Sequence, residues 1–212
     1  MYKRQVLDLW FEKCIKKQLY GEAYLVRFAD DFLIMFQYER DAQRVYEAII
    51  KRMELFGLEL SKEKTRILPF GRYSGSRETF DFLGFTHFNS KTRKGYYSVG
   101  HKISRKKKKQ FKSNLKKWVK ENRNTQFDEF MKALNKKLTG SFNYYSLSGM
   151  IKEVRNLWQH SLYVTFKWLN RRSQRRSFKL ERFYEIWNDR IIHPYIHVDI
   201  WSSDKVIYNK NV

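Results

Sequence analysis

Cysteine and proline are nearly absent from this chain, which has one Cys and two Pro among its 212 residues. The single thiol, Cys14, excludes an internal disulfide. Two Pro and nine Gly leave little room for a flexible linker. Long apolar runs are missing too: no segment approaches the roughly 20 residues of a membrane-spanning helix, and the N-terminus lacks the pattern of a signal peptide. We therefore expect a soluble, cytoplasmic protein with no membrane partner.

Acidic residues are half as numerous as basic ones, since 22 Asp and Glu face 44 Lys and Arg, a net charge of +22. Such a field attracts phosphate backbones whatever their sequence, so we expect a polyanionic partner. Residues 1–100 carry a net +5, whereas residues 101–190 carry 24 basic against 7 acidic side chains. This shift predicts one domain at 1–100, a second at 101–190 and a tail at 191–212. A hydrophobic fraction of 42% supports a real core.

The first 100 residues mix helical and strand patterns. We expect a helix at 6–18, a hairpin at 24–36 and an amphipathic helix at 40–56 that Gly57 ends. Short strands are expected at 58–60 and 65–68 around a polar turn, then an alternating stretch at 79–88 after a Gly- and Ser-rich loop. The core residues predicted for the amphipathic helix are Val45, Ala48, Ile49, Ile50, Met53 and Phe56.

Beyond residue 100 the apolar period becomes helical throughout. The pattern predicts helices at 105–122, 127–138, 147–170 and 179–189, each with an apolar stripe opposite its Lys and Arg residues. Three or four such helices form a bundle. The fold class predicted is α+β: an antiparallel sheet with helices, followed by an all-α helical bundle.

Two adjacent carboxylates, Asp30 and Asp31, interrupt the apolar runs of the expected hairpin. Burying two ionised side chains among such neighbours would cost several kcal/mol unless a cation compensated them. Mg²⁺ takes one or two carboxylates and fills its other positions with water and phosphate oxygens. This is the arrangement of a nucleotidyl transferase. From the dipeptide alone, an ordinary polar turn is the alternative.

The residues around this pair resemble the active-site hairpin of group II intron reverse transcriptases. Residues 24–32 read Tyr-Leu-Val-Arg-Phe-Ala-Asp-Asp-Phe, and the usual core of the family's motif is Tyr-Ala-Asp-Asp. Phe28 in place of Tyr leaves the carboxylates intact but removes a phenol hydroxyl.

The resemblance continues along the chain in the family's order and covers most of residues 6–190. Residues 7–12 are similar to the helix before the hairpin, and 57–65 to the palm motif after it. Residues 134–145 and 168–174 are similar to the thumb, or maturase, domain. The segment that resembles the primer grip consists of Phe82, Leu83, Gly84 and Phe85.

The resemblance implies part of a polymerase palm followed by a helical thumb. It implies binding of template and intron RNA and of a DNA primer, and assistance to splicing. Asp30 would be the main Mg²⁺ ligand, with Asp31 beside it, and Lys64 would approach the triphosphate; a solvated turn lysine is the alternative for Lys64. Gly84 would let a nucleic-acid backbone come close, with a bulge in a packed strand as the alternative.

Two basic clusters are expected to contact nucleic acid. The alternative for the first is a solvated charged face, and for the second it is that the neighbouring aromatic side chains belong to the core. The first opens an expected helix with no acidic residue nearby in the sequence: Arg105, Lys106, Lys107, Lys108 and Lys109. The second follows Trp168, and arginines beside an aromatic suit RNA. It consists of Arg171, Arg172, Arg175 and Arg176.

The family's palm also needs an Asp on an earlier strand, and its fingers precede that strand. Asp8 lies in the helix motif and does not map to this ligand. We therefore expect the C-terminal part of a group II intron reverse transcriptase and maturase, inactive as a polymerase unless an upstream palm and fingers fragment is supplied. A second copy of the chain is another expected partner. The alternatives are a stand-alone RNA-binding splicing factor and a decayed gene remnant.

Overall fold

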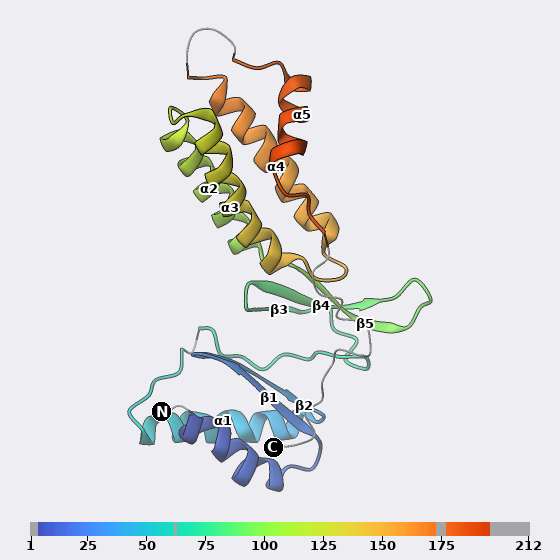
Figure 1. The fold of residues 1–212 in the computed structure, drawn as a ribbon. Helices are drawn as coiled ribbons and strands as arrows, with labels where there is room; N and C mark the ends of the chain where they lie inside the picture. Colours follow the sequence, from blue (N-terminus) through green and yellow to red (C-terminus); the bar gives the residue numbers. More distant parts are fainter. Residues whose placement is uncertain (1–3, 62, 173–176, 196–212) are drawn as a thin grey trace. The chain divides into compact units, whose positions relative to one another are not determined.

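The computed structural model describes residues 4–61, 63–172 and 177–195, and they form a mixed α/β structure (Figure 1). The chain divides into two compact units. The first unit comprises residues 1–83 and 88–99, and the second comprises 84–87 and 100–212. The predicted functional domains at 1–100 and 101–190 stay a prediction. Most of the predicted tail, from residue 196 on, lies outside the described residues.

The first unit opens with a helical segment where the apolar pattern predicts one. It consists of the π-helical η1 (Arg4–Leu9) and η2 (Phe11–Ile15) and the 3₁₀ turn η3 (Lys16–Gln18). Its apolar side chains join those of the next helix, α1 (Glu39–Leu55), in one core. The members of this core are Val6, Leu7, Phe11, Ala23, Val45, Ile49 and Met53.

Strands β1 (Ala23–Phe28) and β2 (Asp31–Phe36) form the predicted hairpin, an antiparallel pair with Ala23 opposite Phe36 and Phe28 opposite Asp31. Side chains alternate between the two faces, so one face packs on the core and the other faces solvent. Asp41 in the first turn of α1 accepts hydrogen bonds from the backbone N–H groups of Tyr20 and Gly21, each at 3.0 Å. This contact fixes the chain just before β1 relative to the helix below it.

Helix α1 ends at Leu55, and the glycine predicted to end it, Gly57, follows the C-cap residue with a φ of +64°. The N–H of Leu58 donates to the carbonyl of Met53, and that of Gly57 to Glu54, the two hydrogen bonds of a Schellman cap. Phe56 was predicted to be in the core, but it is 46% exposed and lies under the Arg52 guanidinium. It stands one residue past the helix, so the helical spacing no longer fixes its direction.

The two short strands predicted at 58–60 and 65–68 are wrong, because neither segment forms a strand. The polar turn between them is present: the N–H groups of Lys64 and Thr65 donate to the carbonyl of Ser61. A strand needs a partner with the complementary register, and apolar alternation over three or four residues does not supply one.

A second sheet has the order β3–β4–β5, with β3 at Thr79–Phe82, β4 at Phe85–Lys91 and β5 at Tyr97–Ile103. The alternating stretch at 79–88 is thus two strands rather than one. They turn at Leu83 and Gly84, whose φ values are +52° and +81°, the pair of positive angles that a type I′ hairpin turn requires. β5 was not predicted from the sequence.

The helices of the second unit pack side by side around one large core (Figure 1). α2 (Arg105–Asn122) has the predicted bounds, whereas α3 (Phe127–Tyr145) runs seven residues beyond the predicted end at residue 138. α4 (Ile151–Leu169) and α5 (Leu180–Arg190) complete the set. None of the helices in the described part of the chain is long and apolar enough to cross a membrane. The largest fully buried side chains of the core include Trp187, Phe130, Phe183, Leu134 and Leu138.

Replacing either of two glycines of the second unit by alanine should change the free energy of unfolding, in opposite directions. Nothing lies within 4 Å of where a Cβ would stand at either Gly140, inside α3, or Gly149, which has a φ of +84°. Gly140→Ala should therefore raise the free energy of unfolding by about 1 kcal/mol, the helix-propensity difference. Gly149→Ala should lower it by about 1–2 kcal/mol, because the left-handed conformation strains an alanine.

Denaturant unfolding of the two variants beside the unsubstituted chain measures both changes. Equal effects in the same direction would contradict the assigned backbone conformations.

Candidate active site and nucleic-acid interface

The Asp pair lies at the tip of the β1–β2 hairpin, as predicted. Ala29 and Asp30 form the two-residue turn, and Asp31 is the first residue of β2. Both residues are exposed, so the cost of burying two ionised side chains among apolar neighbours does not arise. Water can hydrate them, and burial therefore gives no argument for a compensating cation. What remains is an accessible pair of hard oxygen ligands on a tight turn.

The hairpin separates the two acids. Residues 23, 25 and 27 of β1 and residues 32, 34 and 36 of β2 alternate onto the face that packs on the core. Asp31 therefore belongs to the opposite face, paired with the exposed Phe28. Asp30 is in the turn itself, and its charge acts on Arg27. The two carboxylates thus stand in different surroundings although they are adjacent in sequence.

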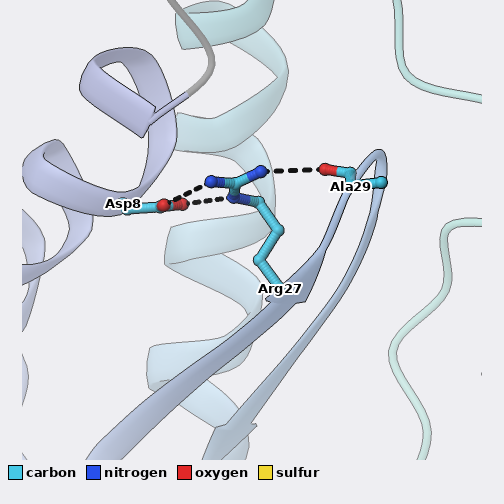
Figure 2. Close-up of polar contacts among 3 residues, drawn as sticks. All are labelled: Asp8, Arg27 and Ala29. Carbon is cyan, nitrogen blue, oxygen red and sulfur yellow. Dashed lines mark hydrogen bonds and ion pairs between the residues drawn. The ribbon is translucent and has the colours of Figure 1, made fainter. Parts of the chain in front are cut away.

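Arg27 joins the hairpin to the first helical segment and to the turn (Figure 2). Its Nε donates to Asp8 Oδ1 at 2.7 Å and its Nη2 to Asp8 Oδ2 at 2.6 Å, a two-pronged ion pair with both side chains less than one third exposed. Its Nη1 donates to the carbonyl of Ala29 at 2.9 Å. One guanidinium therefore fixes both the strand and the turn that carries Asp30.

The Asp8 carboxylate raises the pKa of Arg27, chiefly by accepting these hydrogen bonds; desolvation by burial acts against it, and the charges of Asp8 and Asp30 add to it. Arg27 is thus a permanent cation. Asp30 itself is exposed on the turn.

Ala29 adopts a φ of +52°, which costs a residue with a Cβ roughly 1–2 kcal/mol. A two-residue hairpin needs a positive φ at its first turn position, and glycine or asparagine is the usual choice there. The hydrogen bond from Arg27 to the Ala29 carbonyl offsets part of this strain. Backbone strain of this kind gathers where a turn must present functional groups.

A metal ion would find an incomplete set of ligands here. Within the described ranges, no group of three or more His, Cys, Asp and Glu side chains could hold a metal. The chemistry of Asp30 and Asp31 nevertheless fits Mg²⁺, which needs only one or two carboxylates besides water and phosphate oxygens. Lys64 is exposed on its turn, as the solvated alternative describes, and nothing in the structure tests its approach to a triphosphate.

The primer-grip segment forms the β3–β4 turn. Phe82 ends β3, Phe85 begins β4, and Leu83 and Gly84 make the turn between them. A Cβ on Gly84 would lie 3.5 Å from Lys107 Cγ and 3.5 Å from the Tyr145 hydroxyl, so side chains cover this position. The φ of +81° favours a glycine in this turn, so no bulge is needed to explain it. The approach of a nucleic-acid backbone to this position stays a prediction. Phe85 packs against Tyr144 and Tyr145.

The first basic cluster occupies the first turns of α2. Ser104 caps this helix by accepting from the N–H of Lys107. Lys108 pairs with Glu153 of α4 at 2.5 Å. The cluster therefore has no acidic residue near it in the sequence but has one near it in space. Arg105, Lys106 and Lys109 are exposed.

The second basic cluster lies where α2 and α4 end. The half-buried ring of Trp168 has three cations within 6 Å of its centre: Lys120, Arg123 and Arg171. Arg172 donates from Nε to the carbonyl of Leu169, a C-terminal cap of α4. Cations at the C-termini of helices are favoured by the helix dipole, so stability explains part of this cluster. Arg175 and Arg176 lie outside the described residues.

The sequence reasoning missed the pair of Asp8 and Arg27. Its signal was available: alternation in β1 places Arg27 on the apolar face, where an arginine needs a carboxylate partner. The identity of that partner, 19 residues away, did not follow from local pattern.

Two family models match the chain. Residues 4–87 match reverse transcriptase (RNA-dependent DNA polymerase), and residues 108–185 match the group II intron, maturase-specific domain. The first match contains the hairpin with its Asp pair, and the second runs from α2 into α5. A search of curated proteins found no match to the chain.

Removing the charge of Asp8 should lower the free energy of unfolding more than removing the charge of an acid in an exposed ion pair. Asp8→Asn should lower the free energy of unfolding by about 1–2 kcal/mol, because the fork loses the negative charge and one of its two acceptor oxygens, which an NH₂ donor replaces. Glu12→Gln removes the charge of the exposed pair with Lys16 and should change it by less than about 0.5 kcal/mol. Denaturant unfolding compares the two, and equal effects would show that the fork does not hold the hairpin.

Proposed function

Because this chain belongs to the group II intron reverse transcriptases and maturases, we propose that the first turns of α2 bind the phosphate backbone of RNA. In this proposal the first unit is part of the polymerase palm and the second is the thumb. The RNA is the template or the intron, and a DNA primer pairs with the template.

The proposal rests on a run of basic residues at the N-terminus of α2, where positive charge destabilises a helix. The N-terminus of a helix carries about half a positive charge, so each cation there is disfavoured by roughly 0.3–1 kcal/mol. Five basic residues nonetheless open α2, and an ion pair is recorded for Lys108 among them. A bound phosphate would be attracted both by these side chains and by the helix N-terminus.

The polymerase part of the proposal places Mg²⁺ on Asp30 and Asp31. When bound, the metal supplies electrostatic stabilisation of charge on the transferring phosphoryl group. Arg27 holds the turn through the Ala29 carbonyl, and Asp8 orients the guanidinium. The turn presents Asp30 at an exposed position, where an ion can reach it from solvent. Lys64 is proposed to approach the triphosphate from its exposed turn.

RNA affinity tests the role of α2. The triple substitution Arg105→Ala, Lys106→Ala, Lys109→Ala should weaken binding of a double-stranded RNA by roughly tenfold to a hundredfold at fixed salt. The matched control removes the same charge from exposed residues of the first unit: Lys91→Ala, Arg93→Ala, Lys94→Ala. It should change the affinity by less than about threefold, as fluorescence anisotropy would measure.

The α2 variant should also melt at a higher temperature than the unsubstituted chain, since it loses cations that the helix dipole disfavours. This gain separates a lost binding surface from a damaged fold. Equal losses of affinity in the two triple variants would contradict a specific role for α2.

Metal binding can be tested without any assay of polymerisation. Mn²⁺ accepts the same carboxylate ligands as Mg²⁺ and broadens NMR signals near it. Titration should broaden the signals at the hairpin tip first, Asp30→Asn should abolish this effect, and Asp31→Asn should weaken it less. Broadening that survives Asp30→Asn would place the ion elsewhere.

A further inference from the structure

A groove of about 230 Å³ runs between α2 and α3 in the second unit. It is smaller than the about 300–1,000 Å³ typical of sites for drug-sized ligands, so it suits a group the size of one ring system. The residues that line it are basic, polar or apolar, and none is acidic. None of them belongs to the Asp pair, and Lys107 is its only member from the basic clusters described above.

The polar side chains of the groove stand in two rows. Gln110 and Asn114 are four residues apart on α2 and therefore share one face of that helix, as Lys137 and Ser141 do on α3. Gln110 and Asn114 make no side-chain hydrogen bond within the described part of the chain. Ser141 donates only a long bond of 3.4 Å to the carbonyl of Lys137. The Lys137 ammonium lies over the Trp118 ring, 5.7 Å from its centre. The donors and acceptors left largely unused in these rows are therefore the two amides and the Ser141 hydroxyl.

The base of the groove is apolar and aromatic. Leu115 and Leu138 are buried, and Phe111 and Tyr145 are half-buried beside them. Tyr145 is held edge-on against Phe85, with ring centres 5.5 Å apart. Burial raises the pKa of Tyr145, and the neighbouring Tyr144 adds to the effect, so its hydroxyl remains a hydrogen-bond donor at neutral pH.

We propose that this groove holds one unpaired base of a bound RNA strand, an inference that rests on the proposed function. The apolar base of the groove would contact the flat face of the ring, and the Gln110 and Asn114 amides would bond to its edge. Lys107 and Lys137 border the groove and would pair with the phosphates on either side of the extruded nucleotide.

An unpaired base fits the groove better than a phosphate group or a base inside a duplex would. A phosphate alone would leave the apolar base of the groove uncovered, and a base inside a perfect duplex presents only its edge. Specific RNA recognition commonly takes splayed bases onto aromatic side chains, with amides reading the edge. Stacking of one base is worth roughly 1–3 kcal/mol.

The test compares two RNA duplexes that differ by one bulged nucleotide. The unsubstituted chain should bind the bulged duplex at least about fivefold more tightly than the perfect one. With 2-aminopurine as the bulged base, its fluorescence should fall on binding as the base stacks. Gln110→Leu with Asn114→Leu keeps the bulk but removes the amides, and should reduce the preference to about twofold or less.

Ser113→Leu is the matched control, because it adds an apolar side chain to an exposed position on α2 that does not line the groove. It should retain the full preference. Equal affinity of the unsubstituted chain for both duplexes, or an unchanged preference in the double variant, would overturn the proposal. Failure to bind either RNA would overturn the proposed function together with it, whereas strong binding without preference would overturn the groove alone.

Discussion

Repulsion among like charges is the main force that the packing of this structure must overcome. A net charge of +22 opposes compaction, and most of the excess lies in the second unit. The bundle withstands it because its interior is large and aromatic, with Trp187 and Phe183 fully buried. Some cations are placed where helices favour them, at the C-termini around Trp168. Those at the start of α2 are not, and their position is explained by binding rather than by folding.

The hairpin of the first unit carries two acidic residues on a strained turn. Arg27 donates two hydrogen bonds to the Asp8 carboxylate and one to the Ala29 carbonyl of the turn, so its guanidinium links the first helical segment to the turn that carries Asp30. Ala29 adopts a left-handed conformation that is unfavourable for an isolated alanine. The same strand alternation that buries the inner face sends Asp31 to the outer one. The two adjacent acids therefore have different surroundings in the structure.

Local pattern predicted the elements whose cause is local. The hairpin follows from alternation, the end of α1 from a glycine, and α2 from the helical period of its apolar residues. Errors arose where distant residues decide: β5 exists because β4 pairs with it, and α3 continues through Gly140 because Phe142 is buried in the bundle. The ion pairs of Arg27 and Lys108 join segments far apart in sequence, so the charge pattern predicted a basic surface but not its partners. The roles of Asp30, Asp31 and Lys64 stay predictions from family resemblance.

Salt dependence decides whether the cations at the start of α2 contact phosphate. Each neutralised phosphate adds about 0.9 to the slope of log affinity against log salt concentration on a duplex. We would measure that slope for the unsubstituted chain and for the variant lacking Arg105, Lys106 and Lys109. We expect the variant's slope to be shallower by about two to three. Parallel slopes would show that these side chains are solvated charges and that RNA binds elsewhere on the protein.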